Sequence, residues 1–179
     1  MARSVTARSD YDPGVPGDET FADVLAANEA YARSFPHSGL QSRAAQGLAV
    51  LTCIDSRIEP LAMLGLVPGD AKILRNAGAR VTSDVLRTLV LASHLLAVDR
   101  VMVIAHTDCR MTGSEADVHA AVRDAGGPDT EALDFLVTED QEATVRADVE
   151  LLRSSPYLTH VRVGGFRYDV EGGRVTELA

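Results

Sequence analysis

Five side chains that could do chemistry together occur in two short stretches of the sequence. Cys53, Asp55 and Arg57 lie at alternate positions in LTCIDSRIEP, and His106 and Cys109 are three apart in AHTDCRM. Two thiols and an imidazole are a donor set that Zn²⁺ prefers. Three protein ligands leave the fourth tetrahedral position open, as in catalytic rather than structural zinc sites. Both cysteines could instead be small buried hydrophobes, but their polar neighbours argue against purely apolar surroundings.

Apolar runs and helical periodicity predict alternating strands and helices. Continuous apolar runs are typical of strands buried on both faces, and capping residues ahead of an apolar helical period are typical of helices. This alternation favours an α/β fold with a mostly parallel sheet flanked by helices. The expected strands are 47–53, 71–75, 100–105 and 159–169, the last near an edge, and the expected helices are 19–34, 82–97 and 138–154.

The expected strands bring the candidate ligands together. Cys53 ends the first strand, and His106 and Cys109 follow the third. The carboxyl ends of parallel strands meet at one edge of an open α/β sheet, where ligands bind. If the first and third strands are neighbours, the two thiols, the imidazole, Asp55 and Arg57 converge at that edge.

Length and composition set the class of the protein. The 179 residues are enough for one domain whose core needs no disulfide. We expect a flexible, polar leader over residues 1–17 and a single zinc-binding α/β domain over residues 18–179. The net charge of −9 argues against nucleic acid or an anionic membrane as a partner. No apolar run is long enough to span a bilayer, and two cysteines without a recognisable signal peptide favour a cytoplasmic protein.

Three motifs together resemble the β-class carbonic anhydrases, in particular their short bacterial, actinobacterial-type members. They are CIDSR, GDAKILRNAG and HTDC, in this order and spacing, and the likeness extends from NEAYARSF to the final GFRYDVEGGRVTEL. The resemblance implies one zinc ion per chain, held by Cys53, His106 and Cys109, with Asp55 and Arg57 as a catalytic dyad. It also implies an antiparallel strand at the edge of the parallel sheet, and a homodimer or homotetramer.

The activity that the resemblance implies is the reversible hydration of CO₂ to bicarbonate and a proton. Zinc lowers the pKa of bound water, so that hydroxide able to attack CO₂ forms near neutral pH. Two thiolates cancel the charge of the metal, so we expect activity to rise into alkaline pH, above the pKa of about 7 of a three-histidine site. Asp55 can orient the hydroxide, and Arg57 can hold Asp55 ionised and away from the metal. In some members of the family the equivalent aspartate takes the fourth zinc position, and the site is inactive.

Three further features lie near the expected site. Asn76, Ala77 and Gly78 follow the second strand, where small residues leave room for a small apolar gas; we expect substrate contacts there, and a plain tight turn fits equally well. Asp108 could support a ligand, but a cap on the following helix is favoured. Arg110 stands where the family usually has glycine, which predicts an altered turn or an additional cation near the cleft.

Other functions fit the same residues. A hydrolase of CS₂ or COS would use the same hydroxide, because those substrates are also linear and apolar. A zinc-binding dimer without turnover, used for assembly or bicarbonate sensing, is a second alternative; Arg110 favours it, whereas Asp55 and Arg57 argue against it. A redox dithiol formed by Cys53 and Cys109 would leave the histidine and the dyad unexplained.

Overall fold

The computed structural model describes residues 21–179, in two units that divide after Gly39. The first unit holds helix α1 (Ala22–Arg33), and none of the twelve residues of this helix is buried. The expected leader, the expected domain boundary at residue 18 and the first two residues of the expected helix 19–34 lie outside the described residues. Within the described part of the chain, no helix has the length and apolar character that crossing a membrane requires.

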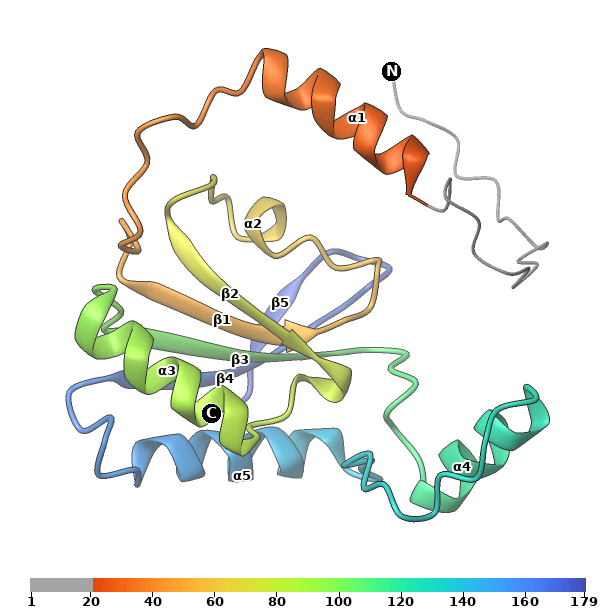
Figure 1. The fold of residues 1–179 in the computed structure, drawn as a ribbon. Helices are drawn as coiled ribbons and strands as arrows, with labels where there is room; N and C mark the ends of the chain where they lie inside the picture. The colour runs from red at the N-terminus through yellow and green to blue at the C-terminus, as the bar shows by residue number, and fades with distance from the viewer. Residues whose placement is uncertain (1–20) are drawn as a thin grey trace. The chain divides into compact units, whose positions relative to one another are not determined.

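The second unit is built on a five-stranded sheet with the strand order β2-β1-β3-β4-β5. The first four strands in this order run parallel, and β5 pairs antiparallel with β4. The predicted fold class, a mostly parallel sheet with an antiparallel edge strand, is confirmed (Figure 1). The strands are β1 (Leu48–Cys53), β2 (Ala71–Asn76), β3 (Arg100–His106), β4 (Arg162–Tyr168) and β5 (Val175–Glu177).

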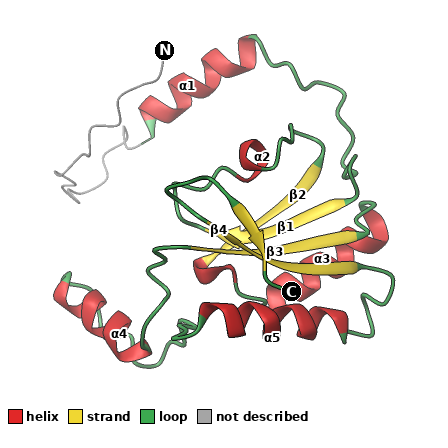
Figure 2. Cartoon of the chain, turned by 180° about the vertical axis from the view of Figure 1, so that it is seen from behind, coloured by secondary structure: helices red, strands yellow, loops and turns green. Residues whose placement is uncertain are grey.

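Helices cover both faces of the sheet, as the two opposite views show (Figures 1 and 2). α3 and α5 pack on one face, where Leu51, Leu89 and Val149 belong to the larger part of the core. α2 and the loop after it cover the other face, around Val50 and Ile104. Because β1 lies between these two layers, all six of its residues are buried, as its continuous apolar run predicts. The helices are α2 (Pro60–Met63), α3 (Ser83–Leu95) and α5 (Gln141–Arg153).

The predicted helix start is correct at α3 and wrong at α5. Thr82 caps α3, its side chain accepting a hydrogen bond from a backbone N–H of the first turn. α5 begins later than expected, with Asp140 as its cap. The sequence patterns do not predict α2, β5 or helix α4 (Glu115–Asp124). Ser114 caps α4, so the expected capping role of Asp108 is wrong; Asp108 lies in the turn after β3 with a left-handed φ of 54°.

The sheet order fulfils the condition for a shared site. β1 and β3 are neighbours, so Cys53 at the end of β1 and His106 at the end of β3 come to the same edge. Cys53 is also aligned with Asn76, the last residue of β2. A short turn of 3₁₀ helix, η1 (Ala77–Ala79), follows β2 there. Three strand ends therefore supply the candidate site.

Candidate metal centre

The three expected zinc ligands meet at the carboxyl ends of β1 and β3. One donor atom each from Cys53, His106 and Cys109 lies within 4.8 Å of the other two. The three residues are 4%, 1% and 9% exposed, so the cluster is shielded from solvent. His106 Nε2 is buried and has no hydrogen-bond partner among the described residues. Because buried polar nitrogens are nearly always paired, an unpaired one beside two sulfur atoms fits a cation-binding site.

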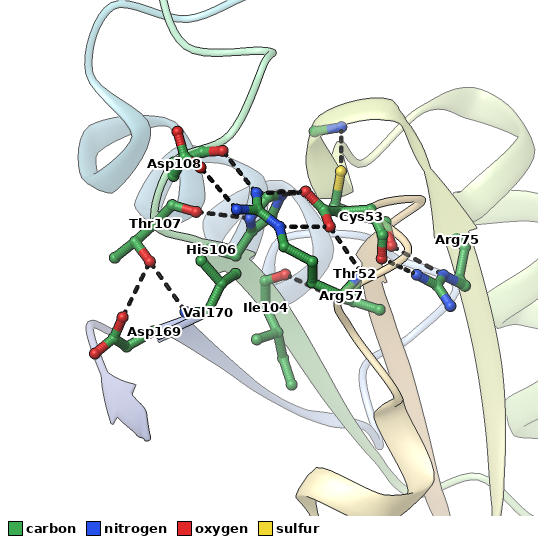
Figure 3. Close-up of polar contacts among 12 residues, drawn as sticks. Thr52, Cys53, Arg57, Arg75, Ile104, His106, Thr107, Asp108, Asp169 and Val170 are labelled. Carbon is green, nitrogen blue, oxygen red and sulfur yellow. Dashed lines mark hydrogen bonds and ion pairs between the residues drawn. The ribbon is translucent and has the colours of Figure 1, made fainter. Parts of the chain in front are cut away.

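The other ring nitrogen of His106 fixes how the imidazole is held. Nδ1 lies 2.8 Å from the carbonyl oxygen of Thr107, an acceptor, so Nδ1 carries the proton. In a neutral ring this leaves Nε2 with the lone pair that a metal needs. The Thr107 hydroxyl is itself tied to the loop after β4: it donates to Asp169 at 3.3 Å and accepts from the N–H of Val170 at 3.1 Å (Figure 3).

The two thiols differ in how readily they lose a proton. A hydrogen bond from the Cys109 thiol lowers the pKa of Cys53 to about 3, against the opposing effect of burial. The backbone N–H of Gly78 acts in the same direction, and the Gly78 nitrogen lies 3.4 Å from Cys53 Sγ. The hydrogen bond to Cys53, together with burial, raises the pKa of Cys109. Cys53 is therefore a thiolate that can bind a cation directly, whereas a cation would have to displace the proton of Cys109.

Asp55 and Arg57 form a bidentate ion pair beside this cluster. Arg57 Nε donates to Asp55 Oδ1 at 3.0 Å and Nη2 donates to Oδ2 at 2.7 Å, and the backbone N–H of Arg57 donates to Oδ1 at 2.9 Å. These bonds hold the pKa of Asp55 well below its usual range, so the carboxylate is ionised at neutral pH. Asp55 Oδ2 lies 4.0 Å from His106 Nε2. The ionised carboxylate is thus next to the donor atoms.

Arg75 of β2 supports the site in a way that the sequence patterns do not reveal. Its Nε donates to the carbonyl oxygen of Cys53 at 2.9 Å, and its Nη2 donates to that of Asp55 at 2.7 Å (Figure 3). Arg75 thereby holds the backbone that carries Cys53 and Asp55. The residue belongs to the motif GDAKILRNAG, but its partners lie 22 and 20 residues earlier, and no spacing rule indicates these contacts with the neighbouring strand and the loop after it.

The expected substrate contacts, Asn76, Ala77 and Gly78, lie at the end of β2 beside Cys53. The Asn76 amide is engaged on both sides: Nδ2 donates to the carbonyl of Arg80 at 2.7 Å, and Oδ1 accepts from the N–H of Arg80 at 2.9 Å. Gly78 has a φ of 77°, a conformation that glycine adopts without cost. Asn76 therefore closes the turn and Gly78 supports the thiolate, whereas contact with substrate stays a prediction.

A cavity of about 1080 Å³ lies between the ligand cluster and α4. Asp55, Arg57 and Cys109 line it on the side of the sheet, and Val118 and Ala121 of α4 contribute an apolar wall. α4 stands out from the sheet in both views (Figures 1 and 2). The cavity reaches the cluster, because Cys109 belongs to both.

Arg110 also lines this cavity, as the expectation of an additional cation near the cleft requires. The alternative expectation, an altered turn, finds no support. Among residues 21–179 the non-glycine positions with a left-handed φ include Asp108 but not Arg110. The turn between His106 and Cys109 therefore makes its reversal at Asp108, and position 110 does not need the conformational freedom of glycine.

The residues of the cluster fit zinc. Two sulfur donors and one imidazole nitrogen suit a borderline-soft cation that prefers four tetrahedral ligands. Thr107 orients the imidazole, and the Gly78 N–H and the Cys109 thiol stabilise the Cys53 thiolate. Such supporting hydrogen bonds are typical of metal sites.

Comparison with known proteins matches most of the chain to one family. Residues 48–175 match the carbonic anhydrase family. The chain is 32% identical over 160 residues to Beta-carbonic anhydrase 1 of Mycobacterium tuberculosis, a match that covers 87% of this chain and 96% of the relative. It is also 32% identical over 156 residues to the carbon disulfide hydrolase of Acidianus sp., a match that covers 72% of this chain and 75% of the relative.

A solved structure extends the likeness to the fold. The crystal structure of carbonic anhydrase from Streptococcus mutans superposes with a TM-score of 0.81 at 36% identity, over 92% of this chain and 100% of that one. The family match spans most of the chain, and the M. tuberculosis relative spans nearly all of both sequences. This chain therefore belongs to the β-carbonic anhydrase family.

Proposed function

We propose that this enzyme catalyses the reversible hydration of CO₂ to bicarbonate and a proton, with one zinc ion per chain bound by Cys53, His106 and Cys109. The observation that carries the proposal is the buried cluster of three donor atoms within 4.8 Å of one another, beside an ionised carboxylate held by an arginine. Zinc in such a donor set keeps one position open and lowers the pKa of water bound there. Membership of the family supports the same reaction.

Asp55 is placed to orient the attacking oxygen. Its carboxylate is ionised and lies next to His106 Nε2. It can therefore accept a hydrogen bond from a hydroxyl beside the donor cluster and direct the lone pair of that oxygen at the carbon of CO₂. Arg57 keeps the carboxylate from turning, because two nitrogens of one guanidinium hold both of its oxygens.

We also propose a homodimer or homotetramer. Phe21 and, in α1, Val24, Leu25 and Tyr31 are each more than half exposed within the described chain. A helix with several exposed apolar side chains is suited to pack on a second copy. Light scattering after gel filtration should give a mass of two or four times 19.1 kDa; the mass of a single chain would contradict this proposal.

Stopped-flow measurement of CO₂ hydration tests the proposed activity. Protein with one zinc per chain should hydrate CO₂ faster than buffer, and the rate should rise from pH 7 to pH 9 or so, because two thiolates in the donor set make bound water less acidic. The Cys109→Ser variant is the control, since it removes one ligand from the cluster. No activity at any pH, with one zinc per chain confirmed, would refute the proposed reaction and favour a zinc-binding dimer without turnover.

Hydrolysis of CS₂ or COS is the second candidate, because the carbon disulfide hydrolase of Acidianus sp. is as similar in identity as the carbonic anhydrase relative. Release of hydrogen sulfide from CS₂, measured on the same zinc-loaded protein, distinguishes the two. We expect CO₂ hydration to exceed CS₂ hydrolysis. The reverse order would assign the enzyme to the second reaction.

A further inference from the structure

Asp108 contacts the dyad from a second side. Its carboxylate Oδ2 accepts a hydrogen bond from Arg57 Nη1 at 2.7 Å, and its carbonyl oxygen accepts one from Arg57 Nη2 at 3.0 Å. Figure 3 shows the Arg57 guanidinium next to Asp108. Sequence patterns give no indication of this pair, because its members are 51 residues apart.

The contacts of Arg57 leave it little freedom. Its Nε and Nη2 face the Asp55 carboxylate, while Nη1 and Nη2 face Asp108. Four of the five N–H groups of a guanidinium are thus used, each in one hydrogen bond. An arginine held along two edges cannot follow a moving carboxylate, whereas one held along a single edge can turn together with its partner.

The backbone of Asp108 is suited to this role. Its φ of 54° is left-handed, and aspartate and asparagine adopt that conformation more readily than most residues. The turn places the residue between His106 and Cys109, with its carbonyl as well as its side chain directed at Arg57. Glycine at this position would keep the turn and the carbonyl contact, and would remove only the carboxylate.

We propose that Asp108 is a positioning residue: its carboxylate anchors the Arg57 guanidinium, which in turn holds Asp55 beside the metal centre without letting it become a ligand. Asp55 Oδ2 lies 4.0 Å from His106 Nε2, so a small rotation brings this carboxylate to the donor cluster. The inference rests on the proposed function for the presence of a metal with an open position. It adds a residue that decides whether that position stays open.

Azide binding to the cobalt-substituted protein tests this role. The visible spectrum of Co²⁺ in the centre reports azide at the open position, and Asp55 as a ligand would compete with azide. We expect the azide affinity of Asp108→Gly to fall about 5-fold, the upper end for an exposed ion pair, because Asp108 is 81% exposed. Asp108→Asn, which keeps the turn and one acceptor oxygen, should lose less. Asp84→Asn, which removes a similarly exposed carboxylate (73%) paired with Arg87 on α3, should bind azide like the unmodified protein.

A double-variant comparison separates positioning from a general structural effect. In an Asp55→Asn background, Asp108→Gly should no longer change the azide affinity, since the competing carboxylate is gone. An equal loss in both backgrounds, or no loss in either, would overturn the proposal. This outcome is independent of CO₂ turnover: a protein that binds azide as expected but hydrates no CO₂ would refute the proposed function and leave the role of Asp108 standing.

The metal-free protein offers a second measurement. The side-chain Nε–H signal of Arg57 in ¹⁵N NMR, identified by its absence from an Arg57→Lys variant, should be sharp and slow to exchange in the unmodified protein. In Asp108→Gly it should broaden and exchange faster with water. An unchanged signal in a folded Asp108→Gly protein would show that Asp108 does not anchor Arg57.

Discussion

Removing one partner of the largely buried ion pair between Asp148 of α5 and Arg80 should cost far more stability than removing one partner of an exposed pair. Asp148 Oδ2 lies 2.9 Å from Arg80 Nε and also accepts from the N–H of Val81 at 3.0 Å. The side chains of Asp148 and Arg80 are 8% and 21% exposed. Arg80 in turn bonds Asn76 through its backbone and the carbonyl of Leu136 through Nη1. The pair therefore fixes the turn beside the Cys-His-Cys cluster to α5.

Replacing Asp148 by alanine leaves Nε of the Arg80 guanidinium and the backbone N–H of Val81 without their acceptor. Breaking a fully buried pair costs about 3–5 kcal/mol, and the partial exposure of Arg80 puts the expected loss near the lower limit, at about 3 kcal/mol. For a domain of this size that corresponds to a fall in Tm of about 6–12 °C. Urea unfolding followed by circular dichroism, with equal slopes for both proteins, measures the loss in free energy of unfolding.

Asp84 provides the matched control, because it pairs with Arg87 in the same chemistry but both side chains are about three-quarters exposed. Asp84→Ala should lose less than about 1 kcal/mol. A loss below about 1 kcal/mol for Asp148→Ala, or a loss no larger than that of Asp84→Ala, would refute the reasoning that burial makes this pair costly to break.

Three further variants test the site. Cys109→Ser should purify with little zinc, since two ligands remain, and metal analysis showing one zinc per chain would contradict the assigned donor set. Arg57→Ala should keep zinc but lose most CO₂ hydration because Asp55 is freed to reach the metal; full activity would contradict this. The same variant tests the ion pair in the metal-free protein, because Arg57 lowers the pKa of Asp55 from its ordinary 3.8. The loss in free energy of unfolding caused by Arg57→Ala should be largest above pH 3.8, shrink below it and vanish once the pH falls through the lowered pKa. A loss independent of pH would argue against the ion pair. Gly78→Ala should lower the free energy of unfolding by about 1–2 kcal/mol, because Gly78 has a left-handed φ and an added Cβ would lie 3.2 Å from that of Met111. Unchanged urea unfolding would show that the turn adapts to the added methyl group.

The sequence predicts the parts of the fold that depend on long apolar runs. The continuously apolar segments ending at Cys53 and His106 form the two central strands, because a strand buried on both faces has no polar alternation. α2, with four residues, and β5, with three, are too short for any periodicity to develop. α4 lacks a buried residue, so its apolar pattern is weak.

The candidate site also has a part that the sequence predicts and a part that it does not. Ligand types and their spacing predict the cluster of Cys53, His106 and Cys109. The residues that support the site are predictable only from three-dimensional contacts. Arg75 of β2 reaches the carbonyl of Cys53 on the neighbouring strand β1, and Asp108 contacts Arg57 from a turn whose left-handed φ no local pattern signals. Local rules favour a helix cap at Asp108 because aspartate is a common capping residue, and the long-range contact with Arg57 prevails instead.

Exchange of ¹⁸O from labelled bicarbonate, followed by mass spectrometry at chemical equilibrium, is the most direct test of the central claim. It measures interconversion of CO₂ and bicarbonate without a pH indicator. Protein carrying one zinc per chain should deplete the label much faster than the same protein stripped of metal. Equal depletion rates for the zinc-loaded and metal-free proteins would contradict the assignment of this Cys-His-Cys cluster as a CO₂-hydrating centre.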